Sequence, residues 1–121
     1  MPSQQEELRE RTKDFAVRIV KVYRSLNWKA DAQVLGKQLL RCGTSVAANY
    51  RAARRARSKA EWIAKLGIVV EEADETVFWL EMLQECGIVR PKKLELLLKE
   101  AHELSALFTA SQKTSRSVGR S

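Results

Sequence analysis

The sequence predicts an all-α fold, an antiparallel up-and-down four-helix bundle, and three observations support this. Apolar residues recur at intervals of three, four and seven along four segments, which is the spacing of amphipathic helices. The chain of 121 residues has only 5 Gly and 2 Pro and is rich in Ala, Leu, Glu, Lys and Arg, a composition typical of helical proteins. The segments are joined by short connections, which favour antiparallel neighbours. We therefore expect one domain over residues 1–113 and a flexible tail at 114–121.

The first two helices are expected to form a hairpin. The first covers about residues 4–27, and the second runs to Ala53. Asp31 is placed to cap the second helix by accepting a backbone N–H bond. Gly36 and Gly43 each cost that helix about 1 kcal/mol relative to Ala. They indicate either the close approach of a neighbouring helix or tolerated weak points.

The third and fourth helices are predicted from their start and stop signals. Ser58 and Glu61 have the spacing of a capping box, which predicts the start of the third helix. Gly87 is placed for a left-handed C-cap at its end. Pro91 predicts the first turn of the fourth helix, because that position tolerates a missing N–H. We expect the fourth helix to end near Lys113.

The third helix has more apolar surface than one core requires. A second flank, formed by Ile63, Val70, Phe78 and Trp79, lies beside its core stripe. In a short chain such a surface favours burial against other copies of the same protein. We therefore expect a homo-oligomer.

Several functional classes are excluded by the sequence. No stretch approaches the roughly 20 apolar residues of a membrane span, so we expect no membrane partner. The N-terminal residues lack the apolar run of a signal peptide. Cys42 and Cys86 are predicted to be reduced core residues, and a cytoplasmic protein fits these observations best. His102 follows Glu100 by two residues, which is not the Glu-x-x-His spacing of di-iron bundles. We predict no metal, no cofactor and no enzymatic activity.

Charge is strongly segregated along the chain. The net charge is +7. Residues 28–59 contain eight basic residues and one acid, whereas residues 60–87 contain seven acids and one lysine. The densest basic part, here called the basic cluster, consists of Arg51, Arg54, Arg55, Arg57 and Lys59.

The basic cluster has two interpretations. It either binds phosphate, because the guanidinium fork matches phosphate oxygens and clustered charge releases counterions, or it pairs with acids within or between subunits. In an antiparallel hairpin only Glu61 and Lys65 would carry charge beside the cluster, which favours phosphate. The candidate acidic partners lie further along the third helix: Glu71, Glu72, Asp74, Glu75, Glu81 and Glu85.

A polar stripe lies beside the apolar stripe of the second helix. It consists of Gln38, Arg41, Ser45 and Asn49. It forms either a hydrogen-bonded seam with another helix, which would fix their register, or a solvated face. Tyr50 is the one aromatic residue near the basic cluster and is expected in the core. Any nucleic-acid recognition is therefore expected to involve backbone and shape rather than base sequence.

Several short motifs together resemble one bacterial family of four-helix bundles. They are Arg11-Thr12-Lys13-Asp14-Phe15-Ala16, Gln38-Leu39-Leu40-Arg41, Ala48-Asn49-Tyr50-Arg51, Ser58-Lys59-Ala60-Glu61 and Glu72-Ala73-Asp74-Glu75-Thr76. Members of this family include proteins encoded in intervening sequences of large-subunit ribosomal RNA genes, and the accessory variability protein of diversity-generating retroelements. The resemblance covers about residues 8–112 and implies a homopentamer. For the retroelement members it also implies a surface that binds RNA or DNA and a reverse transcriptase partner.

The resemblance also implies roles for individual residues. The implied nucleic-acid contacts are Arg41, Arg51, Arg54, Arg55 and Arg57. The implied polar seam consists of Ser45, Asn49, Glu72 and Glu75. One departure is Ala52, which stands where the family usually has Glu and leaves the basic segment more positive. Two functions remain: a nucleic-acid-binding accessory protein, or an oligomeric scaffold whose basic helix pairs with acids of a neighbouring subunit or of a partner.

Overall fold

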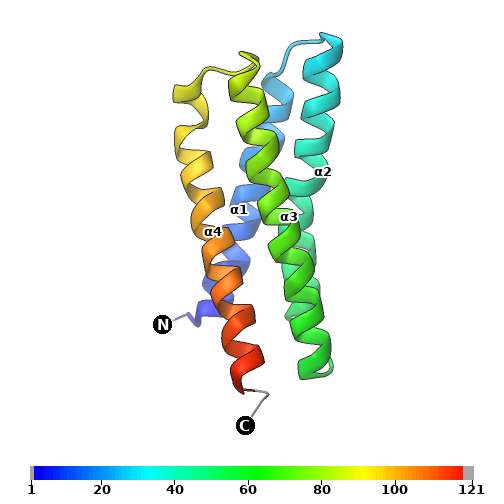
Figure 1. Ribbon diagram of the computed structural model, residues 1–121, viewed down its shortest axis with the longest axis vertical. Helices are drawn as coiled ribbons and strands as arrows, with labels where there is room; N and C mark the ends of the chain where they lie inside the picture. The colour runs from blue at the N-terminus through cyan, green and yellow to red at the C-terminus, as the bar shows by residue number, and fades with distance from the viewer. Residues whose placement is uncertain (1, 119–121) are drawn as a thin grey trace.

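The computed structural model describes residues 2–118 and contains four helices joined by short loops (Figure 1). They are α1 (Gln4–Ser25), α2 (Ala30–Ala53), α3 (Lys59–Glu85) and α4 (Pro91–Val118). Successive helices run in opposite directions and pack side by side. The start of α1, the α2–α3 loop and the end of α4 therefore lie at one end of the bundle (Figure 1). The predicted all-α fold is confirmed.

The core runs along the whole bundle, and every helix contributes to it. Large side chains that are almost fully buried include Phe15, Leu39, Leu80 and Phe108. Burying one such side chain contributes about 1.5–3 kcal/mol, so their regular spacing on each helix stabilises the fold more than helix propensity does. Arg11 adds a polar link between α1 and α4, because its guanidinium pairs with two carboxylates of α4, those of Glu100 and Glu103.

The glycines of α2 allow α1 to approach closely. A Cβ atom at Gly43 would lie 2.8 Å from both Cγ atoms of Ile19, and one at Gly36 would overlap the side chain of Leu26. Both separations are shorter than a normal contact between carbon atoms. Of the two interpretations of these glycines, the structure supports the close approach of a neighbouring helix at both.

The predicted cap of α2 is wrong. The helix begins at Ala30, its N-cap is Lys29, and no side chain caps it. The side chain of Asn27 accepts the N–H of Lys29 at 2.8 Å, and the carboxylate of Asp31 accepts the N–H of Ala32. The loop bond at Asn27 thus places the helix start before Asp31. Asp31 is left in the first turn, where its charge still suits the helix dipole.

The signals around α3 and α4 are largely confirmed. The hydroxyl of Ser58 accepts the N–H of Glu61 at 3.1 Å. The reciprocal bond is displaced by one residue, because the Glu61 carboxylate accepts the N–H of Arg57 rather than that of Ser58. Gly87 has a φ of 71°, the left-handed conformation expected for it. Pro91 begins α4.

Two predictions near helix ends differ from the structure. The helix α4 continues to Val118 rather than ending near Lys113, and the hydroxyl of Ser115 accepts the indole N–H of Trp62 at 3.0 Å. Of the predicted tail, residues 119–121 lie outside the described residues. Cys42 is buried, as predicted, but Cys86 is exposed because it caps the C-terminus of α3.

Candidate nucleic-acid interface

The basic cluster lies at the α2–α3 turn, at one end of the bundle. Arg51 occupies the last turn of α2, Arg54 is the C-cap residue, and Lys59 is the first residue of α3. Arg55 and Arg57 lie in the loop between them, with exposed side chains. Backbone hydrogen bonds hold this loop close to the helix end, from Arg55 N–H to the Ala52 carbonyl and from Ala56 N–H to the Ala53 carbonyl. The loop therefore presents the cations on a defined surface.

The side chains of the basic cluster form no salt bridge in the described part of the chain. Within residues 2–118, ion pairs form at Arg11, Arg18 and Arg41, and none forms at the five residues of the cluster. The Nε atom of Arg54 is buried and has no hydrogen-bond partner in the same part of the chain. One predicted alternative was that the cluster pairs with acids of its own chain. The described structure contains no such ion pair.

Helix electrostatics do not explain the whole cluster. A cation at the C-terminus of α2, such as Arg51, is stabilised by the helix dipole by about 0.3–1 kcal/mol. Lys59 lies at the N-terminus of α3, where the same dipole opposes a positive charge. The helix dipole therefore accounts for the placement of Arg51 but not for that of Lys59.

A groove between α1 and α2 extends the basic surface. It has a volume of about 570 Å³ and is lined by Arg9, Lys13 and Arg51, with Glu10 as its one acid. Small side chains of α2, those of Thr44, Ala47 and Ala48, complete the lining. The sequence reasoning missed Arg9 and Lys13. Their i,i+4 spacing on the polar face of the first helix was the available signal, since the predicted hairpin places that face beside the end of α2.

The predicted polar seam is formed in part, between α2 and α3 of one chain. Two oxygens of Glu75 accept hydrogen bonds from the Arg41 guanidinium at 2.7 Å, and Glu72 accepts a longer one at 3.4 Å. The side chain of Gln38 accepts a further bond from Arg41. Burial raises the pKa of Glu72, while the nearby Arg41 opposes that shift.

The other two residues of the predicted stripe do not join this network. Asn49 donates its side-chain amide to the carbonyl of Ser45 within α2 at 2.9 Å. Arg41, expected from the resemblance to contact nucleic acid, is instead engaged by carboxylates of α3. The candidate interface therefore comprises the basic cluster and the groove, without Arg41.

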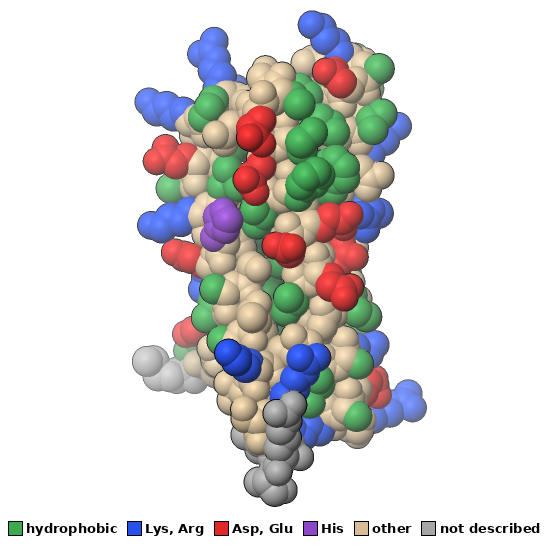
Figure 2. Space-filling model, in the orientation of Figure 1, with side chains coloured by type: hydrophobic (Ala, Val, Ile, Leu, Met, Phe, Trp, Pro, Cys, Tyr) green, Lys and Arg blue, Asp and Glu red, His purple; other side chains and the backbone are tan. Residues whose placement is uncertain are grey.

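The exposed face of α3 has a different character. Acidic and apolar side chains gather along its upper half (Figure 2). Phe78 is 51% exposed, and its ring packs edge-on against Trp79 with centroids 4.9 Å apart. Glu71, Asp74 and Glu81 are exposed on the same helix. These acids lie further along α3 than its first turn, whereas the basic cluster lies at the α2–α3 turn.

Comparison with known proteins identifies the family. The family model described as 23S rRNA-intervening sequence protein matches residues 4–110. The chain belongs to this family. A solved structure from Bacteroides thetaiotaomicron, described as a protein of unknown function from the S23 ribosomal protein family, superposes with a TM-score of 0.85. It is 35% identical, and the match covers 92% of this chain and 99% of that chain. The sequence matches none of the curated proteins with which it was compared.

Two negative findings apply to residues 2–118 of this 23S rRNA-intervening sequence family member. None of its helices is long and apolar enough to cross a membrane. In that part of the chain, no group of three or more His, Cys, Asp or Glu side chains is arranged to hold a metal ion.

Proposed function

We propose that this protein is a non-enzymatic nucleic-acid-binding accessory protein, which holds an RNA or DNA backbone on its basic cluster and the adjoining groove. The observation that carries this proposal is the set of five cations at the α2–α3 turn, whose side chains form no salt bridge within residues 2–118. The groove adds Arg9 and Lys13 from α1. Phosphate oxygens are the ligands that such a surface fits best.

RNA is the first ligand to test, and two relationships support this choice. The family's name refers to intervening sequences of 23S ribosomal RNA. The motifs of α2 also resemble the retroelement accessory proteins, for which RNA or DNA and a reverse transcriptase are the implied partners. In this proposal, the protein presents the nucleic acid to another protein or enzyme. The acidic and apolar face of α3 remains available for protein contacts.

The strength of the interaction is expected to depend steeply on salt. Each neutralised phosphate contributes about −0.7 to the slope of log K against log salt for single strands, and about −0.9 for duplexes. If all five cations of the basic cluster contact phosphates, the slope is about −3.5 to −4.5. The groove residues would make it steeper.

The decisive experiment measures RNA binding by fluorescence anisotropy across a salt series, with a ribosomal RNA fragment as the probe. The test variant is R55E/R57E, because both side chains are exposed in the α2–α3 loop. The matched control is K92E/K93E, which makes the same charge change at exposed positions in the first turn of α4. We expect the first variant to flatten the slope by at least about 1.4, the value for two lost contacts, and the control to change it much less. Binding that is insensitive to salt, or equal losses in both variants, would refute the proposal.

An oligomeric scaffold is the second candidate, and the exposed α3 face favours it. Ile68 and Phe78 are 43% and 51% exposed beside acidic residues, a surface that suits burial against another copy. In this scheme the basic cluster pairs with acids on α3 of a neighbouring subunit, and the resemblance implies a homopentamer. The variant R55E/R57E would then dissociate the oligomer in light-scattering measurements, whereas an assembly that persists would count against that pairing.

A further inference from the structure

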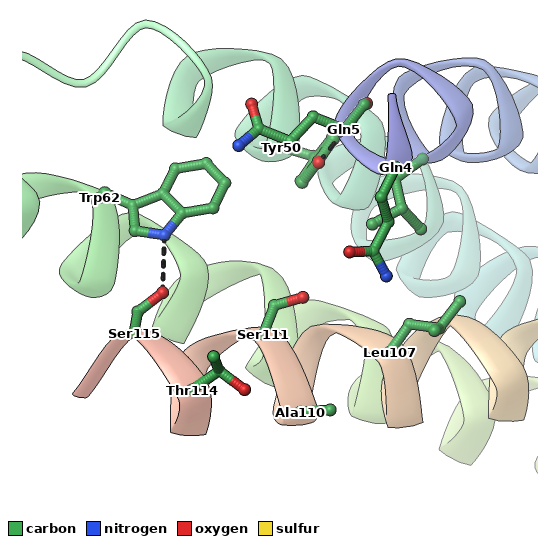
Figure 3. A pocket seen from close by; sticks show the side chains of 10 residues that line it. Gln4, Gln5, Tyr50, Trp62, Leu107, Ala110, Ser111, Thr114 and Ser115 are labelled. Carbon is green, nitrogen blue, oxygen red and sulfur yellow. Dashed lines mark hydrogen bonds between the residues drawn. The ribbon is translucent and has the colours of Figure 1, made fainter. Parts of the chain in front are cut away.

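The bundle end that holds the basic cluster contains a pocket to which all four helices contribute. Its volume is about 310 Å³. Figure 3 shows the indole of Trp62 on one side, Gln4 and Gln5 of α1 on the other, and Ser111 and Thr114 of α4 along the floor.

The walls of the pocket combine an aromatic surface with unused polar groups. Trp62 is half-buried, donates a hydrogen bond to Ser115, and makes a T-shaped contact with the Tyr50 ring, 6.4 Å away between centroids. The side chains of Gln4, Ser111 and Thr114 make no hydrogen bond with other groups in residues 2–118. Their amide and hydroxyl groups can therefore both donate to and accept from a ligand.

A nucleobase has the matching chemistry. Its faces are apolar and stack on aromatic side chains, whereas its edges carry donors and acceptors. The pocket volume lies near the lower limit for small-molecule sites, which leaves room for one planar ring system rather than for several. The apolar side chains of Leu8, Leu107 and Ala110 also line the pocket.

The pocket also lies beside the basic cluster. Tyr50 lines the pocket, and its carbonyl accepts the N–H of Arg54, one helical turn further along α2. Trp62 follows Lys59 by less than one turn of α3. A strand whose phosphates contact the cluster would therefore pass the mouth of the pocket.

We infer that this pocket receives one unpaired base of an RNA whose backbone lies on the basic cluster. The inference rests on the proposed function and adds to it a preference for unpaired over fully paired RNA. It also differs from the expectation from sequence, because Trp62 supplies an aromatic surface where only Tyr50 was considered.

The test compares a single-stranded RNA with a blunt duplex that contains the same strand. The variant W62L removes the aromatic surface and W62F retains one. The matched control is W28L, because Trp28 is 90% exposed and belongs to the α1–α2 loop, which lies at the opposite end of the bundle (Figure 1). We expect W62L to weaken single-strand binding about tenfold, within the range measured for base stacking on aromatic residues. Duplex binding should be unchanged, W62F should recover most of the loss, and W28L should have no effect. The variant S111L, which fills the pocket and retains Trp62, should reproduce the effect of W62L.

A fluorescence readout separates this inference from the proposed function. In the variant W28F/W79F, Trp62 is the remaining tryptophan, and stacking on it should quench its emission with the single strand and with adenosine monophosphate, but not with the duplex. Equal effects of W62L on both RNAs, or no effect on either, would overturn the pocket and leave the backbone interaction intact. If neither RNA binds at low salt, the proposed function fails. The adenosine monophosphate titration then decides the pocket alone, since absence of quenching would overturn it.

Discussion

Replacing Gly43 by Ala is expected to destabilise the protein, although the same change in an open helix would stabilise it. Ala is favoured over Gly in a helix by about 1 kcal/mol. At Gly43, however, the new Cβ would lie 2.8 Å from both Cγ atoms of Ile19, which is fully buried and stiff because it is β-branched. Overpacking of this kind costs about 1–3 kcal/mol. The net expectation is a loss of about 0–2 kcal/mol.

The same substitution at Gly67 provides the control. A Cβ atom there would meet only the amide nitrogen of Gln112, at 2.9 Å, and this flexible side chain can move away. The hydrogen bond that Gln112 would lose, to the carbonyl of Ile63, is long at 3.4 Å. Gly67→Ala is therefore expected to stabilise the protein by up to about 1 kcal/mol.

The measurement is urea unfolding followed by far-ultraviolet circular dichroism, at one fixed protein concentration because assembly would shift the apparent stability. The two variants should differ by up to about 3 kcal/mol, with Gly43→Ala the less stable. A Gly43→Ala variant as stable as Gly67→Ala would show that α1 and α2 are not packed as closely as described. Ile19→Ala adds a second check, because its cost should be smaller in the Gly43→Ala background, where the new methyl group fills part of the cavity.

Two further predictions concern the thiols and one carboxylate. Cys86 is exposed and Cys42 is buried, and burial raises the pKa of the Cys42 thiol. A thiol reagent should therefore modify one cysteine in the folded protein and both after unfolding. Rapid modification of Cys42 in the folded state would contradict its burial. Burial also raises the pKa of Glu72, although the nearby Arg41 opposes this shift. The Glu72 carboxyl group therefore binds its proton more tightly in the folded state than in the unfolded chain. Ionisation of Glu72 at neutral pH thus lowers the stability of the folded state. The stability of Glu72→Gln relative to the original protein should therefore rise as the pH increases through the raised pKa of Glu72. Urea titrations measure this stability difference, and a value that is constant from mildly acidic to neutral pH would refute the prediction.

The elements that the sequence predicts correctly depend on local signals. The apolar periodicity marks four helices, and the signals at Ser58, Gly87 and Pro91 depend on residues within a few positions of each other. The incorrect prediction that Asp31 caps α2 also has a local cause. The Asn27 side chain accepts the N–H of Lys29, and α2 begins before Asp31. The polar composition after Lys113 does not indicate a helix.

The parts that sequence reasoning missed depend on register between helices. The pairing of Arg41 with Glu75 requires knowing which turns of α2 and α3 face each other, and periodicity along each helix does not contain that information. Apolar periodicity alone places Trp62 on the core stripe of α3, whereas the pocket beside it is formed by the ends of four helices that are distant in sequence. The composition of the basic cluster and the scarcity of acids beside it were predicted, whereas the absence of salt bridges to it in the described chain required the folded arrangement.

The placement of the chain ends has a practical consequence for biochemical work on this protein. The start of α1 and the end of α4 lie at the same end of the bundle as the α2–α3 loop (Figure 1), so an affinity tag or fluorescent fusion at either end would crowd the surface meant to be assayed. Cys86 lies at the other end of α3, a helix of 27 residues, or about 40 Å long. A maleimide dye on this native thiol could report binding without competing for it.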